Sequence, residues 1–154
     1  MRKFTCSIIL TILVITLAAC SSPEKMNLKS LQISVYDASS QSKDVTLTIK
    51  EKVITSKTDS ITLILTNISD KQYIFGEKPI LEVKSDGTWK VVPYLKTAAW
   101  DDIAYILPPG KNRELKLSIK NNYGRLSKGS YRAVKELSSK KGENTFSAAE
   151  FEVK

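Results

Sequence analysis

Apolar residues alternate with polar residues along most of this chain, and the period of the alternation constrains the fold. Residues 45–49 read VTLTI and residues 61–65 read ITLIL, so apolar side chains recur at every second position. A period of two places successive side chains on opposite faces of an extended strand, whereas a helix requires a period of 3.6. The alternation recurs over residues 115–119, 130–137 and 146–153. No segment after the first 20 residues carries a sustained helical period, so the sequence predicts an all-β fold.

Turn residues separate the alternating segments. Residues 80–84 and 89–92 flank the tetrapeptide SDGT, in which Asp86-Gly87 supplies the positive φ angles that a tight hairpin requires. A second turn is predicted at Pro108-Pro109-Gly110. About seven short strands over roughly 110 residues are typical of a β-sandwich or a β-barrel.

The last alternating segment changes phase. Phe146 and Ala148 share one parity, whereas Ala149, Phe151 and Val153 share the other. An extra residue in a strand shifts the parity of the residues after it. We therefore expect a β-bulge in this strand.

A motif in residues 126–131 favours a β-sandwich over a β-barrel. Leu126-x-x-Gly129-x-Tyr131 resembles the tyrosine corner of Greek-key sandwiches, in which the glycine permits a tight turn. The tyrosine ring then enters the core, and its hydroxyl bonds to the backbone a few residues upstream. An ordinary buried tyrosine after a glycine turn is the alternative. On the first interpretation Leu126, Gly129 and Tyr131 are structural residues.

Several segments together are similar to a bacterial immunoglobulin-like (Ig-like) domain. They are ITLILTNISDKQYIFGEKPILEV (61–83), the DGTW turn (86–89), the Pro109-Gly110 turn and YGRLSKGSYRAVK (123–135). This family occurs in surface proteins and lipoproteins, mostly of Gram-positive bacteria. The resemblance implies an Ig-like Greek-key β-sandwich of about seven strands over residues 44–154, with an extracytoplasmic role. It implies no catalytic residue.

The first 20 residues resemble a bacterial lipoprotein signal peptide. Arg2 and Lys3 precede an apolar stretch at residues 8–17, and Leu17-Ala18-Ala19-Cys20 resembles a lipobox. The resemblance implies cleavage between Ala19 and Cys20 and lipidation of Cys20 by a diacylglyceryl group that carries fatty acids such as palmitate. It thus predicts a signal peptide at 1–19, a lipidated flexible tether at 20–43 and a membrane anchor on the outer face of the cell membrane. An ordinary secretory signal is the alternative.

The available side chains restrict the chemistry. The chain has no histidine, which removes histidine-based acid–base catalysis and histidine-containing metal sites. With Cys20 lipidated, no free thiol remains in the mature chain. Three Ser-x-x-Lys matches are attributed to coincidence in a chain rich in serine and lysine. We therefore expect no enzyme activity, no cofactor and no metal.

The chain is basic, with 24 lysines and arginines against 16 acidic residues. Cleavage before Cys20 removes Arg2 and Lys3 and leaves a net charge of +6. No stretch combines clustered basic residues with aromatic ones, so nucleic acid is not an expected partner. Anionic lipid or an anionic wall polymer would attract such a surface, whereas the charge alternatively serves solubility.

Two regions carry candidate binding residues. The irregular stretch 94–105 holds Trp100 beside Asp101, with Tyr105 at its end, and aromatic residues on loops provide contact area for sugars or peptides. The alternative is that Trp100 folds back onto the sandwich. Arg132, together with Lys128 and Lys135, is predicted as a basic patch, with a solvated strand face as the alternative.

These features predict a lipid-anchored protein of the cell envelope that presents a non-catalytic Ig-like interaction module. The partner is a cell-envelope protein or an anionic wall polymer. The alternative is a structural or electrostatic module that adheres to wall polymer or to the membrane surface without a specific pocket.

Overall fold

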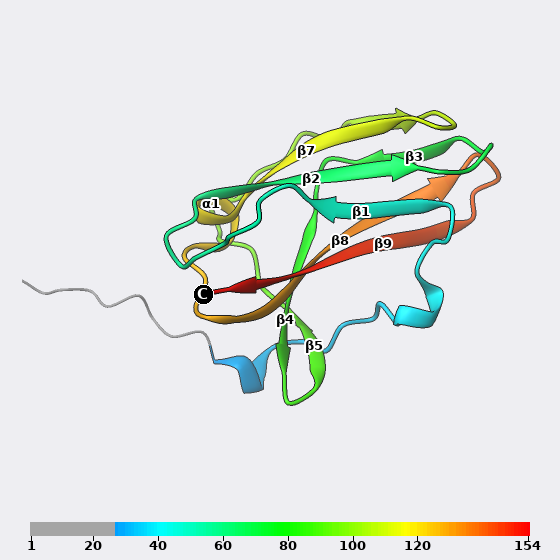
Figure 1. The fold of residues 1–154 in the computed structure, drawn as a ribbon. Helices are drawn as coiled ribbons and strands as arrows, with labels where there is room; N and C mark the ends of the chain where they lie inside the picture. Colours follow the sequence, from blue (N-terminus) through cyan, green and yellow to red (C-terminus); the bar gives the residue numbers. More distant parts are fainter. Residues whose placement is uncertain (1–26) are drawn as a thin grey trace, which may run out of the picture.

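The computed structural model describes residues 27–154, which form two antiparallel β-sheets packed face to face (Figure 1). The prediction of an all-β sandwich is confirmed, with nine strands in place of about seven. The strands are β1 (Val45–Ile49), β2 (Ser60–Asn67), β3 (Tyr73–Gly76), β4 (Ile80–Ser85), β5 (Thr88–Val91), β6 (Ala104–Leu107), β7 (Asn112–Ser118), β8 (Gly129–Ser139) and β9 (Asn144–Val153). Three short helical turns connect or precede them: η1 (Leu28–Ser30), η2 (Ala38–Ser40) and α1 (Ile119–Tyr123).

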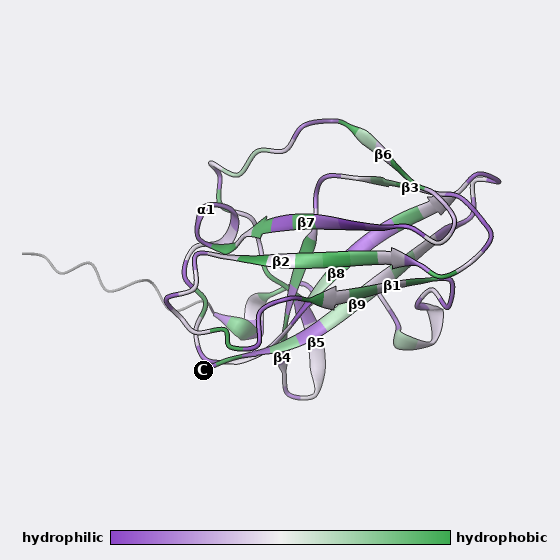
Figure 2. Ribbon diagram, turned by 45° about the horizontal axis from the view of Figure 1, so that its top comes forward, coloured by the Kyte–Doolittle hydropathy of each residue, from purple (hydrophilic) through white to green (hydrophobic). Residues whose placement is uncertain are grey.

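One sheet has the strand order β1-β2-β7. Its central strand, β2, pairs with β1 along one edge and with β7 along the other. The alternation seen in the sequence places Ile61, Leu63 and Leu65 on the face that is turned toward the other sheet, where they are fully buried. In Figure 2 β2 is largely green, whereas the edge strand β7, which is mostly exposed, is largely purple because most of its residues are hydrophilic.

The second sheet is built around β8. Strand β9 pairs with one edge of β8 from Gly129↔Val153 to Ser138↔Asn144. The opposite edge is shared, because both β4 and β3 pair with β8 there. Strand β5 continues the sheet beyond β4, and β6 continues it beyond β3. The predicted hairpin is the β4–β5 connection, in which Asp86 and Gly87 both have positive φ angles.

Apolar side chains from both sheets fill the space between them. Burying an apolar side chain of this size contributes about 1.5–3 kcal/mol, so this layer is the main source of stability. The largest fully buried apolar side chains come from both sheets and from α1: Ile61, Leu63, Leu65, Leu81, Leu107, Leu117, Ile119 and Leu137.

The phase change in the last strand has a different cause from the predicted bulge. The β8–β9 register runs without interruption, so the prediction of a bulge is wrong. Phe146 is instead on the outer face of the sheet, where its ring packs edge-on against Tyr36 with 5.1 Å between the centroids. An apolar residue of the other parity is needed because a further segment covers this outer face.

That segment comprises residues 31–42, which we call the N-terminal segment. It was predicted to belong to the flexible tether, but it is hydrogen-bonded to the domain. The Val91 amide donates to the Gln32 carbonyl (2.8 Å), and the Ser34 amide donates to the Trp89 carbonyl (2.9 Å). At its far end the Ser42 amide donates to the Phe146 carbonyl (2.7 Å). In Figure 1 the segment, blue to cyan, runs past β4 and β5 toward the start of β9.

The tyrosine-corner geometry is present at the start of β8. The Tyr131 hydroxyl donates to the Ser127 carbonyl over 2.9 Å, and the ring stacks on Phe151. Gly129 has a φ of +151°, which residues with side chains rarely adopt. Leu126 is buried beneath the turn. Burial raises the pKa of the Tyr131 hydroxyl, which therefore stays a hydrogen-bond donor at neutral pH.

Replacing Tyr131 with phenylalanine is expected to lower the free energy of unfolding by about 1 kcal/mol, because one net hydrogen bond is lost while the ring remains. Urea denaturation measures this change. Tyr105→Phe is the matched control, since the Tyr105 hydroxyl has no hydrogen-bond partner among residues 27–154. Equal denaturation midpoints for wild type and Tyr131→Phe would return Tyr131 to the role of an ordinary core residue.

Candidate functional site

The sheet built around β8 is interrupted between the end of β3 and the start of β4. Ile74 is paired with Ser138 of β8, and Ile80 is paired with Val134. Three residues of β8 (135–137) lie between these pairs, whereas five residues (75–79) lie between them along β3 and the β3–β4 connection. The extra residues cannot continue the ladder, so residues 75–79 leave the edge of β8. The sequence PILEV marks the restart, since Pro79 lacks an amide hydrogen for the ladder.

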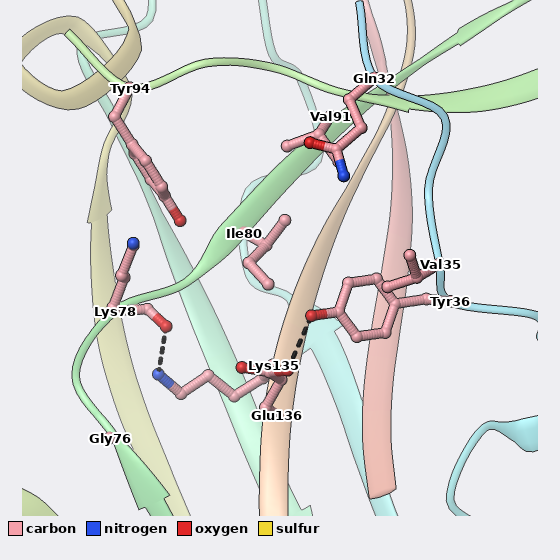
Figure 3. Close-up of a pocket in the computed structure, with 10 residues that line it drawn as sticks. All are labelled: Gln32, Val35, Tyr36, Gly76, Lys78, Ile80, Val91, Tyr94, Lys135 and Glu136. Atoms are coloured by element: carbon pink, nitrogen blue, oxygen red, sulfur yellow. Dashed lines mark hydrogen bonds between the residues drawn. The ribbon is translucent and has the colours of Figure 1, made fainter.

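A cavity of about 380 Å³ lies beside this opening (Figure 3). It is bounded by the N-terminal segment, the β3–β4 connection, the start of β4, the end of β5 and the middle of β8. Ligand sites of this size are typically apolar with a few placed polar groups. The lining residues fit that description: Gln32, Val35, Tyr36, Gly76, Lys78, Ile80, Val91, Tyr94, Lys135 and Glu136.

Lys135 is the most unusual residue of the lining. Its side chain is only 1% exposed, and its ammonium donates to the carbonyls of Glu77 (2.9 Å) and Lys78 (3.1 Å). These two bonds hold the connection that has left the ladder, as Figure 3 shows for Lys78. Within residues 27–154 no carboxylate lies within ion-pair distance of this ammonium. Burial lowers the pKa of Lys135 to about 8, although Glu77 and Glu136 oppose the shift.

Aromatic residues form a second wall. The Tyr94 hydroxyl donates to the Pro79 carbonyl (2.5 Å), which the Tyr123 hydroxyl also reaches (3.0 Å). Trp100 packs edge-on against Tyr94 with 4.5 Å between the ring centroids. The ammonium of Lys78, which is exposed, lies 4.5 Å from the centroid of the Tyr94 ring. Such cation–π contact holds a mobile lysine near the cavity mouth at a gain of about 0.5–1 kcal/mol.

The N-terminal segment supplies the facing wall. The Tyr36 hydroxyl donates to Glu136 Oε1 over 2.8 Å, a contact that Figure 3 shows across the cavity from Tyr94. Burial raises the pKa of Tyr36, and the bond to Glu136 raises it further. Tyr36 is therefore a neutral donor throughout the physiological range. Val35, beside it, leaves an apolar side chain 77% exposed.

The structure separates the predicted binding residues. Trp100 is half-buried and adjoins the cavity through Tyr94 and Lys78. The backbone amide of the exposed Asp101 donates to Glu77 Oε2 over 2.8 Å. Tyr105, on β6, packs instead against Phe75 and beneath the Arg113 guanidinium.

The prediction of a basic patch around Arg132 is wrong for two of its three residues. Arg132 is 3% exposed and Lys135 is buried, so only Lys128 remains exposed. Arg132 is on the outer face of β8, which the N-terminal segment covers. Its guanidinium donates to Glu82 Oε2 (2.5 Å) and to the Tyr36 carbonyl (2.8 Å). The solvated-face alternative fails for the same reason.

The sequence contained a signal for Lys135 that the prediction did not use. Tyr131, Ala133, Lys135 and Leu137 share one parity, and three of these four residues are apolar or aromatic. A lysine in that series must point inward, because the parity of a strand fixes the face of each side chain. The alternation of Leu31, Ile33 and Val35 with polar residues allowed a short strand in the N-terminal segment. It did not indicate the contribution of that segment to the site, because its packing depends on contacts with distant strands.

The site provides binding groups: one buried ammonium, one exposed ammonium, two tyrosines and an apolar wall. No group of three acidic, cysteine or histidine side chains gathers within residues 27–154 in a way that suits a metal ion. Over the same residues, no helix has the length and apolar character needed to cross a membrane. Cys20 and Ala19, the predicted lipidation and cleavage residues, lie outside the described residues.

The two packed antiparallel sheets and the tyrosine corner define an Ig-like β-sandwich. The profile of the bacterial Ig-like domain family matches residues 41–152, and the chain belongs to that family. No curated protein matches the sequence.

Several solved structures are similar to the fold. The Northeast Structural Genomics Consortium target SoR45 is 12% identical with a TM-score of 0.47, covering 72% of this chain and 86% of that one. The archaellum periplasmic stator protein FlaG from Sulfolobus acidocaldarius is 14% identical with a TM-score of 0.40, covering 70% and 99%. The Myf fimbrial major subunit MyfA from Yersinia enterocolitica, in complex with galactose, is 16% identical with a TM-score of 0.40, covering 71% and 98%.

Replacing Lys135 with methionine is expected to abolish a rise in stability above about pH 8. In the folded protein Lys135 loses its proton near pH 8, whereas an ordinary lysine in the unfolded chain keeps its proton up to its usual pKa of 10.5. Between these values the unfolded state binds more protons, so the free energy of unfolding rises with pH, by about 2 kcal/mol at about pH 9.5. Below about pH 8 both states are protonated, and the cost of burying the charge is fully present.

Urea denaturation at about pH 7, 8.5 and 9.5 measures the rise, with Lys84→Met as the matched control because Lys84 is exposed in the same sheet. The series stops there because buried tyrosines such as Tyr123 and Tyr131 have raised pKa values and lower the stability at higher pH. A wild-type stability that does not change between pH 7 and 9.5 would show that the Lys135 charge carries no burial cost.

Proposed function

We propose that this chain is a lipid-anchored protein of the cell envelope whose Ig-like domain binds a partner without performing chemistry. The cavity between the N-terminal segment and the opened edge of β8 is the binding site. The observation that carries the proposal is the combination of a buried, uncompensated ammonium with aromatic and apolar walls in one cavity. Elsewhere the inward side chains of the sandwich are used for packing, so they cannot contact a partner.

The anchor in this proposal is Cys20. Each buried methylene of an acyl chain contributes about 0.8 kcal/mol, and one chain alone holds a protein only marginally at a membrane. A diacylglyceryl group carries two chains and gives stable attachment. Residues 21–27, between Cys20 and η1, could span at most about 25 Å. The cavity, which the N-terminal segment helps to form, would then face partners close to the membrane surface.

Replacing Cys20 with alanine is expected to block lipidation and hence normal processing, so that no mature protein is held at the membrane, because the acyl group has no other attachment point. Cell fractionation followed by a high-salt wash tests this, with Ser21→Ala as the matched control. The prediction of a lipoprotein would be overturned by a Cys20→Ala protein that is still processed and still resists extraction by salt.

Replacing Trp100 with alanine is expected to reduce capture of the partner at least tenfold, because Trp100 holds Tyr94 and Lys78 at the cavity mouth. The purified protein is immobilised, and proteins and polymers retained from envelope extract are quantified. The β-sheet circular dichroism should persist, since Trp100 is half-exposed and outside the buried core cluster. Tyr105→Ala, on β6, is the control for a loss of aromatic surface elsewhere.

Salt dependence of the same capture separates this proposal from its alternative, a module that adheres electrostatically to anionic wall polymer or lipid. The positive net charge of the chain favours that alternative. Adhesion through many exposed lysines would fall steeply with salt and would not respond to Trp100→Ala. If capture falls steeply with salt and is unchanged by Trp100→Ala, the electrostatic alternative is correct and the cavity is not the binding site.

A further inference from the structure

We propose that the cavity binds a small ligand through a single carboxylate, with the ammonium of Lys135 as its counter-charge and the apolar wall holding the ligand body. This inference rests on the proposed function, because it names the chemical class that the same cavity accepts. It begins from Lys135, the buried lysine that lines the cavity.

The ammonium of Lys135 is a buried charge without a counter-ion. A buried charge is costly unless it is paired, and buried lysines are therefore rare in protein cores. Lys135 donates to two backbone carbonyls, but an ammonium has three donor hydrogens. Carbonyl oxygens also offset the charge only partly. A ligand anion in the cavity would supply the missing negative charge and an acceptor for the third hydrogen.

The groups around Lys135 do not supply that charge themselves. Glu136 is the neighbouring residue on β8, but its carboxylate is exposed and accepts the Tyr36 hydroxyl. Glu77 contributes its carbonyl to Lys135, and its carboxylate accepts the Asp101 amide. Both carboxylates act on Lys135 only at longer range, and burial outweighs them. The remaining polar groups of the cavity, Tyr94 among them, are neutral apart from Lys78.

The walls favour a carboxylate with an apolar body over a phosphate. Val35, Ile80 and Val91 form an apolar wall, and Figure 3 shows Ile80 and Val91 between Tyr94 and Tyr36, with Val35 beside Tyr36. A phosphate has more acceptor oxygens and more charge than one ammonium and a few neutral donors satisfy. The Glu136 carboxylate at the cavity wall would also repel a doubly charged ligand. The cavity lining carries two ammonium groups, Lys135 and Lys78, and one carboxylate, Glu136. A single ligand carboxylate bound at Lys135 therefore balances the charge.

Binding of this kind is coupled to the proton on Lys135. An anion beside the ammonium favours its charged form and raises the pKa of Lys135 on binding. Below about pH 8 the site is already protonated and binds without taking up a proton. Above that pH the affinity falls by up to tenfold per unit, because the proton must first be restored. A carboxylate bound at the exposed lysines of the surface would show no such dependence near pH 8.

The experiment uses matched pairs of small probes with the purified protein. N-acetylleucine carries the carboxylate and an apolar body, and N-acetylleucinamide replaces the carboxylate by a neutral amide. Hexanoate tests an aliphatic acid as the source of the carboxylate, and inorganic phosphate tests the competing anion. Nuclear magnetic resonance titrations at about pH 7 and 9.5 follow the amides of Lys135, Lys78 and Tyr94.

We expect saturable shifts with N-acetylleucine or hexanoate, at least tenfold weaker binding of the amide, and at least tenfold weaker binding of the acid at about pH 9.5. The stronger of the two acids identifies a peptide terminus or an aliphatic acid as the source. Lys135→Met should remove the preference for the acid over the amide, whereas Lys84→Met should keep it. If Lys135→Met fails to fold, the comparison of wild-type binding at about pH 7 and 9.5 still decides whether the carboxylate binds at Lys135. Lys78→Gln then tests the contribution of the exposed lysine at the cavity mouth.

Three results would overturn the inference: equal binding of the acid and its amide, tighter binding of phosphate than of either acid, or carboxylate binding that does not change between pH 7 and 9.5. These failures are distinct from failure of the proposed function. Capture from envelope extract that depends on Trp100, together with no carboxylate binding, would retain the cavity as a binding site and reject only the carboxylate.

Discussion

The hydrogen-bond ladder of β8 is the interaction on which the rest of the domain depends. β9 occupies one edge of β8 over its full length, so every other strand of this sheet must join through the opposite edge. Two strands share that edge, and the chain between them is two residues longer than the ladder can accept. Lys135 donates to the displaced carbonyls and thereby closes the gap. The same misfit creates the cavity, so the site is a by-product of how the sheet is joined.

Part of the outer face of this sheet is also buried, which is unusual for a two-layer sandwich. The N-terminal segment covers Arg132 and Glu82, whose ion pair is nearly inaccessible to water. Desolvating two charges cancels much of their attraction, so the pair contributes little net stability. It does specify the position of the segment, since Arg132 also donates to the Tyr36 carbonyl and to the Ser34 hydroxyl. The segment in turn places Tyr36 in the cavity wall.

The sequence predicted those features of the fold that depend on only a few neighbouring residues. The period of two, the Asp86-Gly87 hairpin and the corner at Tyr131 all reflect preferences of a few neighbouring residues, and the structure contains each of them. Strands β3 and β6 were missed because each has only four residues, which is too short for a periodic signal. The phase change at Phe146 was attributed to a bulge because coverage by a distant segment leaves no mark on the strand itself. The cavity escaped prediction for the same reason, since it arises from a register difference between strands.

The attachment of the N-terminal segment has a mechanical consequence under the proposed anchorage. Tension between the membrane and the domain would enter through residues 31–42, which are held to β5 by few backbone bonds in an edge position. Such bonds open one at a time under load, whereas the sandwich resists as a unit. The segment would therefore detach first and withdraw Val35 and Tyr36 from the cavity wall. Occupancy of the cavity would then depend on whether the segment stays attached to the sheet.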